Sequence, residues 1–212
     1  MYAINHATTA LVLKKNAPKT NIWLLLVSVQ LVELLWVLFN YLGIEHYSIS
    51  EGKVHLDYLP WSHSILSAFV FALLAFILFY FLLKQKRTAT VIAIGILSHI
   101  LLDILMHEKD IALSPFAAQP AYGLGIIRYP VIDFAIEWAY GIACCIYFGA
   151  RRNMFIMVSI FNLLDLPVML ASGSALDIFV QYPFLLPTFI LFQIFLTWFF
   201  VARFSKNKRV PS

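Results

Sequence analysis

The stretch that decides the fold runs from residue 62 to residue 107 and reads SHSILSAFVFALLAFILFYFLL (62–83), KQKRT (84–88) and ATVIAIGILSHILLDILMH (89–107). A short turn with Lys84, Lys86 and Arg87 separates two apolar runs. A helix needs about 20 mostly apolar residues to cross the bilayer hydrocarbon, because each residue advances it by about 1.5 Å. The stretch therefore predicts two consecutive membrane-spanning helices joined by a basic turn.

Further apolar segments on both sides extend this pattern over the chain. Together they predict six spans, at about 22–43, 62–83, 89–107, 130–149, 153–172 and 184–204. Of the 212 residues, 62% are hydrophobic and 12% charged, and the mean hydropathy is +0.85. Soluble domains carry about 25% charged residues. The composition thus predicts one all-α domain over residues 1–212, a polytopic helix bundle whose surroundings are the lipid bilayer.

The basic residues predict how the bundle is oriented. Twelve of the 15 fall on one side: Lys14, Lys15, Lys19, Lys84, Lys86, Arg87, Arg151, Arg152, Arg203, Lys206, Lys208 and Arg209. Connections rich in Lys and Arg face the cytoplasm, so we expect both termini there. The first apolar run is expected to be an uncleaved anchor, and residues 3–13 a short helix lying at the inner interface. Because the basic residues follow the helix ends, nucleic acid is not an expected partner.

Ionisable side chains inside the spans are the main functional signal, because each costs about 2.5–3.5 kcal/mol near the centre of a membrane helix. Those within predicted spans are Glu33, His99, Asp103, Glu137 and Asp165, and those near outer ends are Asp133, His63 and His107. The five within spans lie at mid-depth or in the half away from the cytoplasm. This distribution predicts a polar site that opens outward.

His99, Asp103 and His107 follow one another at intervals of four residues, which places them on one helix face. Imidazole nitrogen and carboxylate oxygen suit zinc or a similar divalent ion. His107 lies about 12 Å along the axis from His99. It can join the same ion only if the metal sits near Asp103 or the helix has frayed there; otherwise it contacts substrate or a second ion.

Other helices supply two more candidate ligands. Glu33 stands among apolar residues of the first span, and His63 lies at the start of the second, where Ser62 or Ser64 can cap the helix. The set from three helices is Glu33, His63, His99 and Asp103. A metal with such ligands and an open position lowers the pKa of bound water and creates a nucleophile. Glu137 is then a general base or orients a histidine from outside.

Two kinds of feature leave alternatives open. Buried polar groups can simply hold helices together by hydrogen bonds, and Glu137 and Asp165 fit that interpretation equally well. The outer connection 108–129, rich in Pro, Gly and aromatic residues, is either a lid folded over the bundle or a plain surface loop. Cys144 and Cys145 are adjacent within a span, so we expect small buried side chains and no disulfide.

Three motifs resemble the predicted bacterial inner-membrane metal-dependent hydrolases. They are Trp61-Ser62-His63-Ser64, Ser98-His99 with Leu102-Asp103 and His107, and Asn5-His6. Asp110 with Leu113, and Tyr122-Gly123-Leu124-Gly125, are similar to a segment of a common subgroup. The similarity covers about residues 4–128. It implies a location in the bacterial cytoplasmic membrane and a metal held by His6, Glu33, His63, His99 and Asp103.

The chain departs from that family at two points. Glu33 stands where aspartate is usual, and it follows Val32 instead of proline. The glutamate still provides a carboxylate. The arginine-containing sequence that precedes the second-helix histidine in other members is absent, so the family does not define the substrate of this chain. The charge pattern also places His6 on the inner side, away from the other histidines unless the N-terminal segment inserts.

Together these features lead us to expect a membrane-embedded metal-dependent hydrolase, zinc being the expected metal. Its substrate would be a lipid or a lipid-linked ester, phosphoester or amide. Glu137 and His107 are the candidate catalytic residues. The alternatives are a small proton- or ion-coupled transporter that uses His99, Asp103 and Glu137 as a relay, and a non-catalytic membrane assembly subunit.

Overall fold

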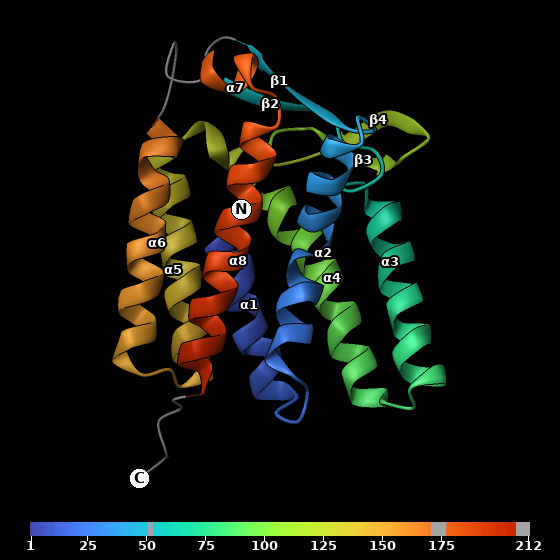
Figure 1. Ribbon diagram of the computed structural model, residues 1–212, viewed down its shortest axis with the longest axis vertical. Helices are drawn as coiled ribbons and strands as arrows, with labels where there is room; N and C mark the ends of the chain where they lie inside the picture. Colours follow the sequence, from blue (N-terminus) through green and yellow to red (C-terminus); the bar gives the residue numbers. More distant parts are fainter. Residues whose placement is uncertain (51–52, 171–176, 207–212) are drawn as a thin grey trace.

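The computed structural model describes residues 1–50, 53–170 and 177–206 and consists mainly of helices that run side by side (Figure 1). The long elements are α1 (Ala3–Asn16), α2 (Ile22–Tyr41), α3 (Ile65–Ile77) continued by the π-helical η1 (Leu78–Leu82), α4 (Lys86–Met106), α5 (Pro130–Phe148), α6 (Arg152–Leu170) and α8 (Leu185–Ser205). The short elements are β1 (His46–Ser50), β2 (Lys53–Tyr58), β3 (Ile111–Ser114), β4 (Ala117–Tyr122), η2 (Ile126–Arg128) and α7 (Asp177–Gln181). The predicted all-α class is confirmed.

Five helices within the described ranges are long and apolar enough to cross a membrane: α2, α3 with η1, α4, α5 and α8. They coincide with five of the six expected spans and make the chain a multi-pass membrane protein. Helix α6 covers residues 153–170 of the remaining expected span, 153–172, and packs beside α5 (Figure 1), but it is not among the five. It contains Asn162, Asp165 and Pro167. Residues 171 and 172 of that expected span lie outside the described residues.

Local sequence explains where α2 and α3 begin. Asn21 caps α2 by accepting a hydrogen bond from the backbone N–H of Trp23 at 3.0 Å. Ser64 caps α3 by accepting from the backbone N–H of Ser67 at 3.2 Å. Of the two serines expected as the cap, Ser64 therefore takes the role. His63 consequently precedes α3 instead of projecting from its first turn.

The expectation that residues 3–13 lie at the inner interface was wrong. They form most of α1, which packs against α2, α5 and α8 in the centre of the bundle. Ile4, Ala7, Ala10 and Leu11 are all 0% exposed. Figure 1 shows α1 starting at about half height and running down to the end where α2 begins. The helix can occupy this interior because its polar side chains have partners there: Thr9, for example, shares a 2.8 Å hydrogen bond with Tyr140.

Both outer connections contain structure that the sequence did not predict, namely the antiparallel hairpins β1–β2 and β3–β4. Segment 108–129 folds back on the end of α4. The backbone N–H of Leu124 donates to the Ile104 carbonyl at 2.8 Å, and that of Gly125 donates to the His107 carbonyl at 2.7 Å. Ile111 in β3 is 0% exposed and packs with the apolar side chains of α3 and α4. The segment thus covers this end of the bundle.

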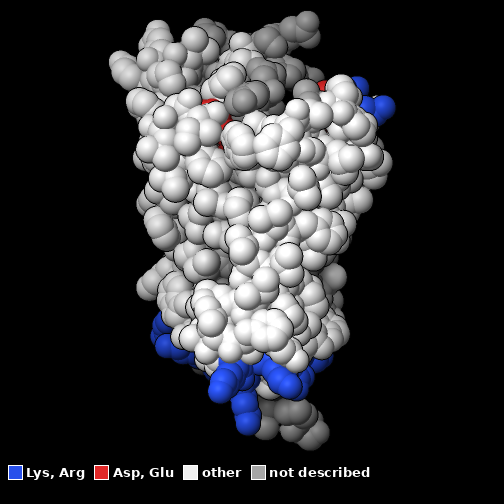
Figure 2. Space-filling model, turned by 90° about the vertical axis from the view of Figure 1, so that its right-hand side faces the viewer, with Lys and Arg blue, Asp and Glu red and all other residues white. Residues whose placement is uncertain are grey.

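The surface on the α3 side matches a protein surrounded by lipid. Figure 2 shows Lys and Arg gathered at the lower end, and the described residues in the wide band above them carry no charge on this face. The turn with Lys84, Lys86 and Arg87 lies at that lower end in Figure 1. Lys208 and Arg209, also expected there, lie outside the described residues. Cys144 and Cys145 are buried and free, as expected.

Candidate metal centre

Three separate elements bring four of the predicted residues together. Glu33 comes from α2, His63 from the turn before α3, and His99 and Asp103 from the second half of α4. The Nε2 atoms of His63 and His99 each lie 3.5 Å from Oε2 of Glu33. The same two nitrogens lie 3.8 Å and 3.0 Å from Oδ2 of Asp103. Four side chains that are distant in sequence thus point at one small volume.

The inserted helix α1 adds His6, the residue that the charge pattern had placed on the inner side. Its Nε2 lies 3.1 Å from Oδ1 of Asp103, and its ring stacks on that of His99 with centroids 3.9 Å apart. The donor atoms form two triads, His6–His99–Asp103 and Glu33–His63–His99, within each of which the atoms lie no more than 4.8 Å apart. His99 is common to both triads.

The backbone fixes the tautomer of His99. Its Nδ1 lies 2.8 Å from the Val29 carbonyl oxygen. Because a carbonyl only accepts hydrogen bonds, Nδ1 must carry the hydrogen, which leaves Nε2 with a lone pair in the neutral ring. This lone pair faces two carboxylates. Nε2 of His99 and Oδ2 of Asp103 are buried, and neither has a hydrogen-bond partner among the described residues.

A second chain of hydrogen bonds fixes the tautomer of His63. The Ser62 hydroxyl donates to Oε2 of Glu45 at 2.6 Å, so its oxygen accepts from Nδ1–H of His63 at 2.8 Å. Oε1 of Glu45 accepts from the backbone N–H groups of Trp61 and Ser62, both at 2.8 Å. Glu45 is 1% exposed. His63 therefore also turns an unprotonated Nε2 toward Glu33 and Asp103.

Glu45 is the residue that sequence reasoning missed. It lies just outside the predicted first span, in a connection that sequence alone would leave solvated. Nothing in the sequence links it to Ser62, because the contact depends on how the chain turns after α2 and returns before α3. Carboxylates and carbonyls behind ligand histidines are a regular feature of metal sites, where they fix the ring and its tautomer. Glu45 and the Val29 carbonyl occupy those two positions here.

His107 and Glu33 form the accessible edge of the cluster. The side chains of His6, His63, His99 and Asp103 are at most 2% exposed, whereas those of His107 and Glu33 are 13% and 20% exposed. Helix α4 ends at Met106, so His107 has left the helical path. Its Nε2 lies 4.0 Å from Oδ1 of Asp103, and its Nδ1 lies 3.3 Å from Oδ2 of Asp110. The predicted polar stripe thus runs from the buried cluster to its edge.

Glu137 lies beside the start of α1 instead of beside the imidazoles. Its carboxylate accepts from the backbone N–H of Tyr2 at 3.0 and 3.2 Å and from Nδ2 of Asn5 at 2.6 Å. The α-amino group of Met1 donates to Oδ1 of Asp103 at 2.9 Å. The two carboxylates therefore hold the N-terminal end of α1 from two sides. A general-base role for Glu137 remains a prediction.

The other predicted acidic residues lie apart from the triads. Oδ1 of Asp165 accepts from Nε2 of Gln193 at 2.8 Å, which joins α6 to α8. This contact matches the interpretation in which Asp165 holds helices together. Asp133 is buried in the first turn of α5, and its Oδ1 has no hydrogen-bond partner among the described residues.

The donor atoms fit a divalent metal in number, type and spacing. Ligand atoms each about 2.1 Å from one zinc ion lie about 3 to 4 Å from one another. The six contacts between the Nε2 atoms and the carboxylate oxygens of Glu33 and Asp103 span 3.0 to 4.0 Å. Nε2 of His99 and Oδ2 of Asp103 are buried 3.0 Å apart and need a positive charge between them, which a proton on the imidazole or a bound cation would provide.

Comparison of the chain with protein-family models, with curated proteins and with solved structures finds no match in any of the three. Any functional conclusion therefore depends on the cluster itself.

Proposed function

We propose that the chain is a membrane-embedded metal-dependent hydrolase with one divalent ion, of the zinc type, beside Nε2 of His99. His6, Glu33, His63 and Asp103 would supply the surrounding donors. The observation that carries the proposal is the pair of fixed tautomers: His63 and His99 both direct an unprotonated Nε2 at the same two carboxylates. Helix packing alone does not require that hydrogen bonds fix the tautomers of two histidines on separate elements.

Geometry favours a metal over protons. Three neutral imidazoles and two carboxylates carry a charge of −2, of which the Met1 α-amino group on Oδ1 of Asp103 offsets one unit. A proton on Nε2 of His99 could bond only one carboxylate well, although this nitrogen lies near both Glu33 and Asp103. Nε2 of His63 faces the same two groups. One cation at the common point satisfies all four atoms, because metal ions accept several ligands at once.

The accessible edge is where a substrate would meet the site. A bound zinc-type ion supplies Lewis acidity and lowers the pKa of water to about 7. Nδ1–H of His107 donates to Asp110, which orients the ring and leaves its Nε2 free to accept or return a proton. We therefore assign His107 the acid–base role and Asp110 its orientation. Glu137 holds the first turn of α1, and through it His6, in place.

The location of the site favours a lipid or lipid-linked ester, phosphoester or amide as substrate. The cluster lies inside a bundle whose surroundings are apolar, near the end opposite the basic turns. We further propose that α6 is the sixth span and that the Lys- and Arg-rich lower end, with the end of α8, faces the cytoplasm. The site then opens outward from the cytoplasmic membrane of a bacterium, as the sequence resemblance implies.

Elemental analysis of the purified full chain tests the proposal. We expect a stoichiometric transition metal in the wild type after zinc supplementation, and its loss in Asp103→Ala and His99→Ala. His46→Ala is the matched control, because His46 is an exposed histidine of the outer hairpin. Hydrolysis of ester, phosphoester and amide lipids should then depend on the metal and fall in His107→Ala, which retains the metal. Wild-type protein without bound metal would exclude the proposal.

One observation favours the transporter as a second candidate. The two residues that precede α1 connect two buried carboxylates, since the Met1 amino group contacts Asp103 and the Tyr2 N–H contacts Glu137. Carboxylate and histidine chains of this kind carry protons in membrane transporters. Proteoliposomes distinguish the two functions: proton or ion flux that His99→Ala abolishes, together with an absence of metal, would support the transporter. An assembly subunit would tolerate Asp103→Ala and His99→Ala without change in either assay.

A further inference from the structure

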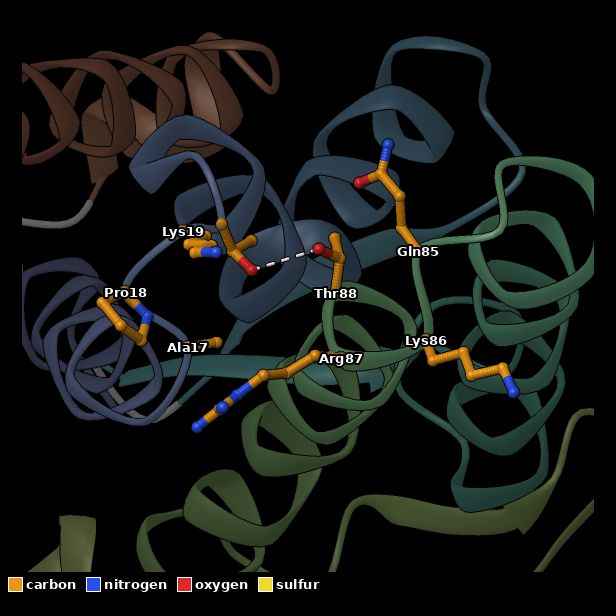
Figure 3. Close-up of a pocket in the computed structure, with 8 residues that line it drawn as sticks. Ala17, Pro18, Lys19, Gln85, Lys86, Arg87 and Thr88 are labelled. Atoms are coloured by element: carbon orange, nitrogen blue, oxygen red, sulfur yellow. Dashed lines mark hydrogen bonds between the residues drawn. The ribbon is translucent and has the colours of Figure 1, made fainter.

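A second polar site lies at the lower end of the molecule, far from the metal cluster along α4. It is an open pocket of about 430 Å³ between the α1–α2 turn and the start of α4 (Figure 3). Small-molecule sites have volumes of roughly 300–1,000 Å³. The polar residues that line the pocket are Lys19, Thr20, Gln85, Lys86, Arg87 and Thr88. The described lining residues contribute three cations and no carboxylate.

The positive charge of this pocket is not neutralised within the protein. No ion pair joins Lys19, Lys86 or Arg87 to a carboxylate in the described ranges of the chain. Arg87 donates from Nη2 to the backbone carbonyl of Asn16, a neutral group. A guanidinium carries five N–H donors, so this contact leaves others for an anion. Lys86 has its Nζ 5.4 Å from the centre of the Tyr80 ring, which also leaves its charge in place.

A hydrogen bond between two threonines lines the pocket, and the N-terminus of α4 lies beside it. The hydroxyl groups of Thr20 and Thr88 share a 3.1 Å hydrogen bond, drawn as a dashed line in Figure 3. Gln85, the residue before α4, makes no side-chain cap bond to the first turn. The first N–H groups of a helix have no partner within it and favour anions. In Figure 3 the Arg87 side chain extends toward Ala17 and Pro18, while that of Lys86 points to the opposite side.

The surroundings indicate that the anion belongs to a lipid. Exposed apolar side chains flank the pocket on the neighbouring helix ends: Leu82 and Leu83 are 71% and 48% exposed, and Trp23 at the start of α2 is 46% exposed. Tryptophan is common at the headgroup level of membrane proteins. A phosphate held in the pocket would thus place its acyl chains beside apolar surface. Basic pockets between spanning helices bind the headgroups of anionic lipids in this manner.

We propose that this pocket binds the phosphate headgroup of an anionic phospholipid, with Lys19 and Arg87 as the main charges and the start of α4 as a further contact. The inference does not depend on the metal centre or on hydrolysis. The ligand class is a phosphodiester lipid with one net negative charge or more. Zwitterionic lipids lack that net charge and should bind the pocket more weakly.

Native mass spectrometry of the full chain in a neutral detergent tests the site. The protein is titrated with phosphatidylglycerol, with phosphatidylcholine and with inorganic phosphate. We expect one phosphatidylglycerol to bind more tightly than phosphatidylcholine, and Lys19→Gln with Arg87→Gln to weaken it by about 25-fold, since each cation near the membrane surface contributes about fivefold. The control is Lys84→Gln with Lys206→Gln, which removes the same charge from the same end outside the pocket.

A second variant, Gln85→Glu, changes the charge of the pocket while the Arg87–Asn16 contact stays in place. It adds a carboxylate and removes no contact on which the fold depends, so it should weaken the binding of phosphatidylglycerol by about fivefold. Equal weakening by the two double variants would overturn the proposal, because it would show diffuse attraction by the basic end. Inorganic phosphate that displaces phosphatidylglycerol at comparable concentration would also overturn it, since the pocket would then be a site for a free anion.

Discussion

Helices α1 and α3 reverse the rule for soluble proteins, in which apolar side chains are buried and polar side chains are exposed. Helix α1 carries Asn5, His6, Thr8 and Thr9, and all four are buried. Helix α3 is far more apolar, yet it buries only Ser67, Ala68 and Ala72 and turns most of its leucines and phenylalanines outward. Lipid tails solvate apolar side chains as well as a protein interior does, so burial gives them little advantage. Polar groups lack that option and gather in the interior, where they find partners.

The difference between the two helices has a functional consequence. Two buried carboxylates hold α1 in the polar interior: Asp103 through His6 and Glu137 through Asn5. On the exterior of α3, no side-chain hydrogen bond or ion pair involves the described residues 68–77. Substitutions inside should therefore change metal binding and stability together. Substitutions of the same size on α3 should change neither.

Metal removal is expected to have the largest effect. A ligand that binds only the folded state stabilises it by about 4 kcal/mol when present at 1,000 times its dissociation constant. For a chain of this size that corresponds to a shift in melting temperature of roughly 8–16 °C. We expect a chelator to lower the melting temperature of the purified wild type by an amount in this range, and zinc to restore it.

Two variants serve as references for the chelator experiment. Asp103→Ala removes a carboxylate on which both α1 and α4 depend, so chelator and zinc should no longer change its melting temperature. Leu73→Ala on α3, whose side chain is 58% exposed, should respond as the wild type does. A chelator effect of equal size in Asp103→Ala would place the metal elsewhere in the protein.

Glu45→Gln should have the next largest effect, a loss of metal affinity, because it reverses the direction of the hydrogen bonds behind His63. The glutamine keeps one oxygen for the N–H groups of Trp61 and Ser62 but presents an amide N–H to the Ser62 hydroxyl. That hydroxyl then donates to Nδ1 of His63, which moves the ring hydrogen to Nε2, the atom directed at the metal. Loss of such outer support weakens metal binding about 10- to 100-fold.

A zinc titration of Glu45→Gln against a competing chelator measures this change. Glu108→Gln is the matched control, because the Glu108 side chain is 34% exposed and pairs with Arg128 at 2.6 Å instead of with Ser62. The control should bind zinc within twofold of the wild type. Unchanged affinity in Glu45→Gln would show that His63 is not a ligand, while leaving the His6–His99–Asp103 triad possible.

The two helices also show which parts of the structure the sequence could predict. Helix α3 and four other spans follow from hydropathy alone, because a long apolar segment has one stable location in a membrane. The spacing of His99 and Asp103 predicts their common face for the same local reason. Helix α1 has 14 residues and several polar ones, so hydropathy gives no sign that it enters the bundle. The placement of His6 beside Asp103 could therefore come only from the resemblance to a known family.

Long-range contacts account for what the sequence could not supply. The Glu45–Ser62 contact spans a hairpin, and no local pattern encodes it. Helix α6 is long enough for a span, but it is not among the five candidate spans found in the described residues, so a span at 153–172 stays a prediction. Its Asn162 accepts a hydrogen bond from Nδ2 of Asn5 in α1 at 2.9 Å, a long-range contact that no local pattern encodes.

Gly141→Ala should have a moderate effect because α1 and α5 touch at this residue. A Cβ at Gly141 would lie 2.6 Å from Oδ1 of Asn5 and 2.8 Å from Cγ1 of Val158. Overpacking of this kind costs about 1–3 kcal/mol. We expect a lower melting temperature and weaker zinc binding, since displacement of Asn5 also shifts His6. Ala139→Val, which adds volume on the exposed side of the same helix, should change neither measurement.

The smallest effect is expected on the outer face of α3. Leu73→Ala should change the free energy of unfolding by less than about 0.5 kcal/mol, because its side chain is 58% exposed and contacts lipid before and after unfolding within the membrane. The same substitution in α1, Leu11→Ala, removes a side chain that is 0% exposed and should cost about 2–5 kcal/mol. Thermal melting of both variants in one lipid nanodisc preparation measures the difference. Equal destabilisation would mean that α3 is covered by protein, which would require a second copy of the chain or another partner on the face that we assign to lipid.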